Sequence, residues 1–287
     1  MDNGKLYNAL LKEQERLRLE SQQAGEAKAE EDFRKERPFA GRPKWSSQTN
    51  EAPELPPTVY DPSVSLGQIA NPRPLSRDQL RDRKIIYPSM PNKGILDAYR
   101  EVRIQLRKKA GDKNFAVMVS SLGRNDASCL TAFNLAVAFS LDAQTAALLV
   151  DCNPHGSDLE QLVSAHLGYG VTDYVADKNL KIADILYPSG IDRLSVIPAG
   201  TQASSAVELF SAVRMRELMG ELHDRYPDRC IIVNAPPFRE STESRILANY
   251  SDQVVFSVPF GQVTGDVVME CVEILGSDKF SGLVFQE

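Results

Sequence analysis

The sequence predicts an α/β domain with a doubly wound, mainly parallel sheet, preceded by a short helix and a disordered linker. Two observations lead to this fold class. After Gly94, short apolar runs rich in β-branched residues alternate with longer segments of helical spacing. The strand candidates are apolar almost throughout, not at every second position, which is typical of a parallel sheet covered by helices on both faces.

The first part of the chain differs in composition from the rest. Residues 1–23 space their leucines partly at helical intervals among many charges and predict a short amphipathic helix, which either docks on a protein surface or stays solvated. Residues 24–84 combine a mixed charge run with many prolines, and ten of the 17 prolines fall between Pro38 and Pro91. Such a segment buries too little apolar surface to offset its ordering entropy, so a largely disordered linker is expected. Residues 85–287 form the predicted α/β domain.

Within this domain, predicted strands and helices alternate. The strands are expected at Phe115–Ser121, Ala146–Asp151, Leu194–Pro198, Cys230–Ala235, Gln253–Val258 and Leu283–Phe285. The helices are expected at Leu96–Lys109, Ser128–Ala143, Asp158–Leu167, Ala206–Arg225, Glu240–Tyr250 and Thr264–Leu275. Ligands of such sheets bind beyond the carboxyl ends of the strands. The segments of interest are therefore residues 120–125, 151–155 and 234–237.

Composition and charge exclude several classes of protein. With 42% hydrophobic and 25% charged residues, the chain has ordinary globular usage and is neither wholly disordered nor fibrous. It has no run of 18 apolar residues and no apolar signal-peptide core at its start, so a cytoplasmic protein with reduced cysteines is expected. The net charge of −6 argues against nucleic acid as a partner. The four cysteines are expected to fill the core.

The first strand exit has the setting of a phosphate-binding loop without its chemistry. Strand, tight loop and helix follow one another over residues 115–143. An intact loop uses glycines to wrap the phosphates, a lysine to reach the outer phosphates and a hydroxyl to hold Mg²⁺. The corresponding stretch here is Gly123, Arg124, Asn125, Asp126, Ala127, Ser128 and Cys129. The stretch keeps one glycine and has no lysine, which predicts a vestigial loop.

Five segments together resemble the bacterial tyrosine kinases of exopolysaccharide biosynthesis. They read ILDAYREVRIQL, VSSLGRNDASCLTAFNLA, AALLVDCNP, LSVIPAGTQASSAVELFSAVRMRELM and HDRYPDRCIIVNAPPFRESTESRILA. The chain looks most similar to the tyrosine autokinases of exopolysaccharide loci associated with PEP-CTERM and exosortase, over roughly residues 85–287. The resemblance implies a sheet of the P-loop NTPase type, like that of the ParA and MinD proteins.

The loop departs from the family pattern at the positions that carry its chemistry. Where the family ends the loop in Gly-Lys-Ser/Thr, this chain has Ala127, Ser128 and Cys129. A serine supplies no ammonium charge, and a thiol is a poor ligand for Mg²⁺. The family's C-terminal tyrosine cluster, which accepts the phosphate, has no counterpart here, because the last tyrosine is Tyr250.

The two other strand exits have also lost acidic residues. The family carries two aspartates at the second exit, and here Asp151 remains while Asn153 replaces the other. Asn234 stands where the family has an aspartate at the third exit, although the two prolines after it are kept. These three residues form a vestigial site with no confident catalytic residue, no metal and no expected cofactor. His155, which follows Asn153 closely, is expected to be solvated.

One element of the resemblance is retained and implies self-association. The family's Glu-x-x-Arg-x-x-Arg segment, used there for subunit contacts, appears here with Asp97, Arg100 and Arg103. An arginine–carboxylate pair across an interface is directional. The same residues are equally compatible with an ordinary solvated helix face.

The leading hypothesis is a catalytically silent, kinase-like protein that regulates or scaffolds exopolysaccharide synthesis and export. The resemblance implies a membrane-embedded polysaccharide co-polymerase or an active kinase paralogue as partner, so that the protein would reach the inner membrane only through a partner. One alternative is a divergent, active tyrosine kinase or ATPase that binds Mg-ATP, with Arg124 helping. A second alternative is a ParA- or MinD-like partitioning protein.

Overall fold

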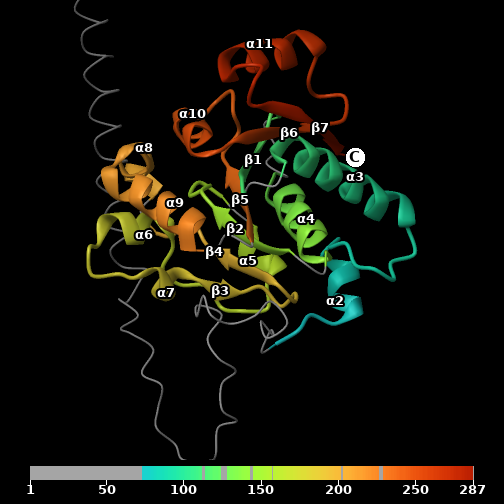
Figure 1. Cartoon of the computed structure of the whole chain (residues 1–287), viewed down its shortest axis with the longest axis horizontal. Helices are drawn as coiled ribbons and strands as arrows, with labels where there is room; N and C mark the ends of the chain where they lie inside the picture. Colours follow the sequence, from blue (N-terminus) through green and yellow to red (C-terminus); the bar gives the residue numbers. More distant parts are fainter. Residues whose placement is uncertain are drawn as a thin grey trace, which may run out of the picture. The chain divides into compact units, whose positions relative to one another are not determined.

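The computed structural model describes residues 73–111, 114–123, 128–142, 145–156, 158–201, 203–225 and 229–286. Seven strands form one sheet in the order β3-β4-β2-β5-β1-β6-β7 (Figure 1). The strands are β1 (Ala116–Ser121), β2 (Ala146–Asp151), β3 (Tyr187–Pro188), β4 (Leu194–Ile197), β5 (Arg229–Ala235), β6 (Gln253–Pro259) and β7 (Phe280–Gln286). All neighbouring strands are parallel except β3 and β4, which confirms the predicted fold class.

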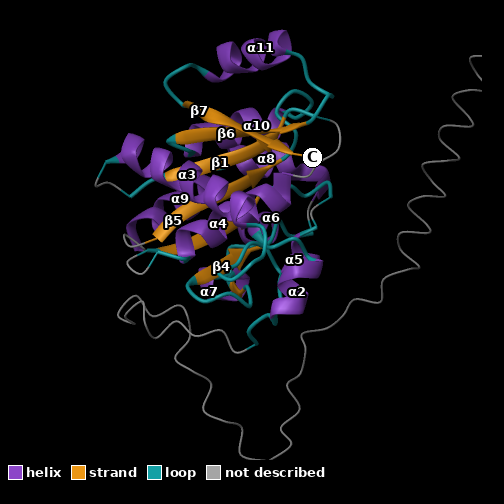
Figure 2. Ribbon diagram, turned by 90° about the vertical axis from the view of Figure 1, so that its right-hand side faces the viewer, coloured by secondary structure: helices purple, strands orange, loops and turns teal. Residues whose placement is uncertain are grey.

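Helices cover both faces of this sheet (Figure 2). They are α2 (Arg77–Asp82), α3 (Lys93–Ala110), α4 (Ser128–Ser140), α5 (Leu159–Leu162), α6 (Val171–Ala176), α7 (Ile182–Ile185), α8 (Ala206–Ser211), α9 (Val213–Arg225), α10 (Thr242–Leu247) and α11 (Gly265–Leu275). Residues of α3, α4 and α5 share one core cluster, and residues of α6 to α11 share the other. Two cores on opposite faces are the mark of a doubly wound sheet.

The central strands are buried on both faces, as their apolar sequences predict. Every residue of β1, β2, β4, β5 and β6 is buried. Side chains alternate between the faces, so Met118 belongs to the cluster of α6 to α11 whereas Val117 and Val119 face α4. Polar residues of these strands are therefore informative, because each one needs a buried partner.

Helix α4 lies directly on the sheet and is buried along almost its whole length. A helix that is apolar all round is expected in such a position. Helix α3 packs outside α4 and is amphipathic, with Leu96 and Leu106 buried and Ile104 exposed. It ends at Gly111, whose positive φ of 67° suits a glycine after the last helical turn.

The predicted linker is too long at its C-terminal end, because residues 75–84 belong to the folded domain. Ser76 and Gln79 form a capping box at the start of α2, in which each side chain accepts a hydrogen bond from the other residue's backbone N–H. Ile85 and Ile86 follow and are both 1% exposed. The predicted helix at residues 1–23 and the first part of the linker lie outside the described residues.

Several predicted elements are shorter than expected. The helix predicted over Ala206–Arg225 is broken at Ala212, whose backbone is extended, into α8 and α9. The helix predicted over Asp158–Leu167 stops at Leu162, because Val163 is extended. The four cysteines are buried and free, as expected for core residues. Burial raises the pKa of the Cys230 thiol, which keeps it protonated.

Candidate functional site

The three strand exits meet because β2, β5 and β1 are neighbours in the sheet. In the register of these strands, Asn234 of β5 lies opposite Asp151 of β2 on one side and opposite Val119 of β1 on the other. Residues opposite one another on adjacent strands place their side chains on the same face. The topology therefore brings Asp151 and Asn234 together at the carboxyl edge of the sheet.

These two residues form a buried hydrogen-bond chain with the first residue of α4. The Ser128 hydroxyl donates to Asn234 Oδ1 over 2.8 Å, and Asn234 Nδ2 donates to Asp151 Oδ1 over 2.8 Å. The three residues are between 0% and 1% exposed. We call this arrangement the Ser–Asn–Asp chain. It gives the asparagine amide a partner for each of its two polar ends.

The Asp151 carboxylate also supports its own strand exit. Oδ1 accepts a hydrogen bond from the Asn153 backbone N–H over 3.0 Å, and the Cys152 N–H donates to the Asn234 carbonyl over 2.8 Å. Burial raises the pKa of the Cys152 thiol, and the neighbouring charge of Asp151 adds to the effect. The carboxylate therefore accepts neutral donors from the Asn153 backbone and from the Asn234 side chain of β5.

Asn153 shapes the loop that follows β2. Its side-chain amide donates to the Gly156 carbonyl over 3.2 Å, and its Oδ1 accepts from the His155 N–H over 3.3 Å. These contacts are the kind by which an asparagine stabilises a turn. The structure thus brings Asn153 next to Asp151 through the backbone and directs its side chain to the loop.

The retained glycine of the first loop has a packing role. A Cβ at Gly123 would lie 2.5 Å from Cγ of Pro259 in β6, so only glycine fits there without a shift. Its N–H donates to the Ser121 hydroxyl over 3.1 Å. Cys129, the last residue of the predicted loop, is buried in the core cluster of α4. The predicted residues Arg124, Asn125, Asp126 and Ala127 lie outside the described residues.

A second polar cluster, which the sequence interpretation missed, connects the β2 exit to α10. His155 Nε2 lies 3.0 Å from Glu243 Oε1, and the Ser241 hydroxyl donates to Glu243 Oε2 over 2.7 Å. Burial alone would raise the pKa of Glu243, but the hydrogen bonds from His155 and Ser241 outweigh burial and lower it. The His155 side chain is 52% exposed, as expected for a solvated residue. Its pairing with Glu243 was not predicted, because 88 residues separate the two in the sequence.

The predicted self-association residues make contacts within their own chain. Arg100 forms an exposed ion pair of 3.0 Å with Asp97, one helical turn before it. Arg103 donates through Nη1 to the Ala138 carbonyl near the end of α4 over 2.8 Å. Arg103 therefore anchors α3 to α4, whereas Asp97 and Arg100 lie on the exposed face of α3.

In the described part of the chain, no three His, Cys, Asp or Glu side chains gather in a way that would hold a metal ion. The described helices also include none with the length and apolar character needed to cross a bilayer.

Comparisons with known proteins agree with this fold. No protein-family model and no curated protein sequence gave a match to the chain. Among solved structures, the kinase domain of VpsO matches with a TM-score of 0.59 and 23% identity, covering 70% of this chain and 99% of that domain. The chimerical protein CapA2B2 matches with a TM-score of 0.63 and 19% identity, covering 76% of this chain and 95% of its own.

The kinase domain of the Escherichia coli tyrosine kinase Etk gives the same result. Its TM-score is 0.62 at 18% identity, and the match covers 75% of this chain and 88% of that domain. At such identities the likeness concerns the fold. The described domain therefore has the fold of the bacterial tyrosine kinase domains.

Proposed function

We propose that this protein is a catalytically silent member of the kinase-like proteins whose fold it has, and that it regulates or scaffolds exopolysaccharide synthesis and export. The Ser–Asn–Asp chain carries the proposal. In a working site of this kind, a lysine and two or three carboxylates position Mg-ATP, as the resemblance of the sequence implies. Here a serine, an asparagine and a single aspartate occupy those positions and bond to one another.

Phosphoryl transfer depends almost entirely on positioning and on stabilising charge. A hydrogen bond to a charged group contributes about 1.5–3 kcal/mol, so the loss of one ammonium and of two acidic side chains removes several such contributions. Mg²⁺ needs nearly octahedral oxygen ligands and commonly takes one or two from carboxylates. Asp151 would have to break its hydrogen bonds with Asn234 and Asn153 to serve in this way. These losses weaken nucleotide binding, and they weaken catalysis still more, because phosphoryl transfer depends on the same charges.

The retained fold supports an interaction role for the domain. The sequence resemblance implies a membrane-embedded polysaccharide co-polymerase or an active kinase paralogue as the partner. Exposed Asp97 and Arg100 on α3 provide charged groups at the place that the family uses for subunit contacts. Contact with the co-polymerase would place the protein at the inner membrane.

Calorimetric titration of the full chain with Mg-ATP and Mg-ADP tests the silence of the site. The proposal expects no saturable heat up to millimolar nucleotide. Ser128→Lys provides the comparison, because it returns an ammonium to the loop. Asp151→Asn provides the matched control, since it removes the one carboxylate at a nearly constant shape.

Two outcomes would reject the silent-site proposal. One is Mg²⁺-dependent nucleotide binding in the micromolar range that Asp151→Asn abolishes, which would favour the divergent kinase or ATPase. The other is tyrosine phosphorylation by the purified chain that depends on Asp151. The regulatory role is tested separately, by measuring autophosphorylation of an active kinase paralogue with and without this protein. An unchanged rate and no co-purification with the co-polymerase would contradict that role.

A further inference from the structure

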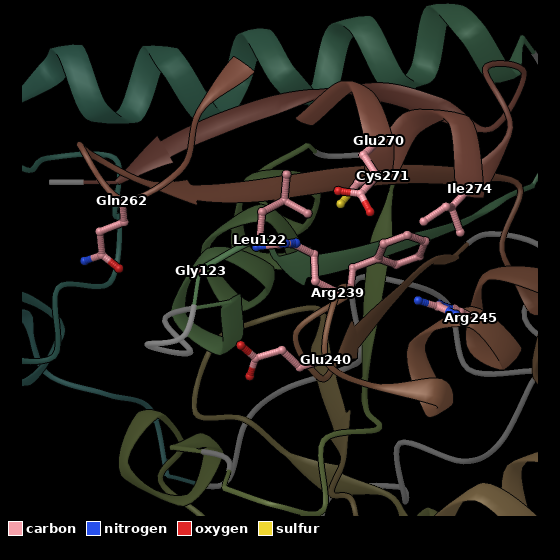
Figure 3. Close-up of a pocket in the computed structure, with 10 residues that line it drawn as sticks. Leu122, Gly123, Arg239, Glu240, Arg245, Gln262, Glu270, Cys271 and Ile274 are labelled. Atoms are coloured by element: carbon pink, nitrogen blue, oxygen red, sulfur yellow. The ribbon is translucent and has the colours of Figure 1, made fainter. Parts of the chain in front are cut away.

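A cavity of about 380 Å³ lies between the connection from β5 to α10, helix α11 and the end of β1 (Figure 3). Its volume falls within the range of small-molecule sites, which is roughly 300–1,000 Å³. The cavity belongs to the face of the sheet covered by α10 and α11, since Leu122, Phe238 and Cys271 all lie in that core cluster. None of the residues of the Ser–Asn–Asp chain lines it.

The apolar part of the wall comes from three different elements. Leu122 follows β1, the Phe238 ring follows β5 and Ile274 belongs to α11. Phe238 is 1% exposed and packs against Phe256 of β6 with ring centroids 5.0 Å apart, so this part of the wall is rigid. The exposed part of the wall is Ile274, which is 49% exposed and offers an apolar surface to a ligand.

Two guanidinium groups accompany this apolar wall. Arg239 follows Phe238 directly, and Arg245 lies on α10. Glu240 and Glu270 also line the cavity, so its wall carries two cationic and two acidic side chains. Figure 3 shows the two arginines near the apolar side chains and Glu240 farther from them. The Asn249 amide donates to the Arg245 backbone carbonyl over 3.4 Å, whereas neither guanidinium group forms an ion pair or a hydrogen bond within the described residues. Both cations are therefore available to a bound anion.

The electrostatic effect of these groups is visible at Cys271, whose side chain also lines the cavity. Burial raises the pKa of its thiol, and this effect dominates. Arg239 makes the largest opposing contribution, Glu270 raises the pKa by less, and Arg245 lowers it further. The two arginines together outweigh the glutamate in their effect on this thiol, although burial keeps its pKa raised.

We propose that this cavity binds a small organic phosphate, with its apolar group against Phe238 and Ile274 and its phosphate between Arg239 and Arg245. A dianionic phosphate matches two guanidinium groups in charge, and guanidinium binds phosphate oxygens in pairs. The proposal does not depend on the function proposed above, because none of the residues of the Ser–Asn–Asp chain lines the cavity, although Gly123 of the first loop does.

The test is a calorimetric titration of the full chain with phenyl phosphate, beside inorganic phosphate and benzyl alcohol as partial ligands. We expect saturable binding of phenyl phosphate with a dissociation constant below about 1 mM. Inorganic phosphate and benzyl alcohol should each bind at least about tenfold more weakly, because each lacks one half of the contacts. Equal binding of phenyl phosphate and inorganic phosphate would refute the apolar contact.

Charge variants locate the site. Arg239→Gln and Arg245→Gln should each weaken phenyl phosphate binding about tenfold or more, because each removes a charged hydrogen-bond donor. Glu270→Gln should strengthen it by about threefold, because it removes the opposing charge. Arg77→Gln is the matched control, since Arg77 is an exposed arginine on α2, a helix that does not line the cavity.

An unchanged affinity for phenyl phosphate in both arginine variants would overturn the proposal, as would the absence of any saturable binding. A loss of binding in Asp151→Asn would also overturn it, because it would place the phosphate at the strand exits. Urea unfolding of each variant separates a lost ligand contact from a lost fold. Neither guanidinium group has a hydrogen-bond or ion-pair partner in the described structure, so unfolding midpoints close to that of the unmodified chain are expected.

Discussion

Replacing Asn234 by aspartate tests the Ser–Asn–Asp chain through its dependence on pH. Asn234→Asp keeps the shape of the side chain and places a second carboxyl 2.8 Å from an oxygen of Asp151. Two carboxylates at this distance cannot both ionise, so the pair holds one proton at neutral pH. While that proton is present, the introduced carboxyl can still donate to Asp151 and accept from Ser128.

The cost follows from the pKa of the introduced carboxyl. In the unfolded chain it is about 3.9, and a shared, buried proton raises it to about 6 in the folded chain. Each unit of difference corresponds to about 1.36 kcal/mol. A raised carboxyl pKa costs nothing below about pH 4, and the free energy of unfolding then falls as pH rises until the folded pKa is passed. We therefore expect a loss of about 1.5 kcal/mol at pH 5 and nearly 3 kcal/mol at pH 8.

Urea unfolding followed by far-ultraviolet circular dichroism at several pH values measures this loss. Asn249→Asp is the control, because Asn249 is exposed on the turn after α10 and should stay within about 0.5 kcal/mol of the unmodified chain. If Asn234→Asp is as stable as the unmodified protein at pH 8, the hydrogen bonds of the Ser–Asn–Asp chain are refuted. A loss of the same size at pH 5 and pH 8 would also refute them, because it would indicate a steric cause.

Three further variants examine the surrounding structure. Glu243→Gln should cost about 1 kcal/mol at pH 7, because it weakens the pair with His155. Since the pKa of Glu243 is lowered in the folded chain, the difference in urea midpoint should disappear as the pH falls through that lowered pKa, and a difference that stays constant with pH would contradict the pairing. Ile86→Ala should lower the free energy of unfolding in urea by about 3 kcal/mol, because Ile86 is buried. Ile95 is 46% exposed, so the control Ile95→Ala should cost under about 0.5 kcal/mol, and equal losses would refute the packing of residues 85–86 onto the domain. Gly200→Ala should lower the melting temperature strongly, because φ is +94° and the new Cβ would lie 2.5 Å from Thr172 Oγ1. The new Cβ of Gly156→Ala meets no atom within 4 Å, so this control variant should lower the melting temperature less, and the reverse order would contradict the assigned backbone.

The sheet could be predicted from the sequence because its central strands are apolar at every position. All six predicted strands are present, and only the two-residue strand β3 was not predicted. A strand of two residues shows no periodicity in the sequence. Tyr187 of β3 pairs with Val196 of the antiparallel strand β4, which follows after a short connection. The breaks inside predicted helices arise where tertiary packing sets the backbone, as at Ala212, and the composition of these segments gives no sign of them.

The candidate site divides in the same way. Asp151 and Asn234 could be predicted as neighbours, because parallel strands end at one edge of the sheet. The pairing of His155 with Glu243 depends on where α10 begins after Pro237, which local sequence does not specify. Arg239 and Arg245 were passed over for a related reason, since exposed arginines near a turn carry no pattern and become noteworthy only when a cavity lies between them.

Asn134 of α4 gives the domain a mechanical property. Its amide donates to the Lys84 carbonyl over 3.1 Å and its Oδ1 accepts from the Ile86 N–H over 3.0 Å, so it clamps the segment through which the N-terminal part of the chain joins the domain. Asn134 lies six residues, or about 9 Å, along α4 from Ser128. A force applied to the chain ahead of α2 would therefore act on α4, the same helix whose first residue, Ser128, bonds to Asn234 at the strand exits. Such a force could reach the Ser–Asn–Asp chain without any rearrangement of the sheet.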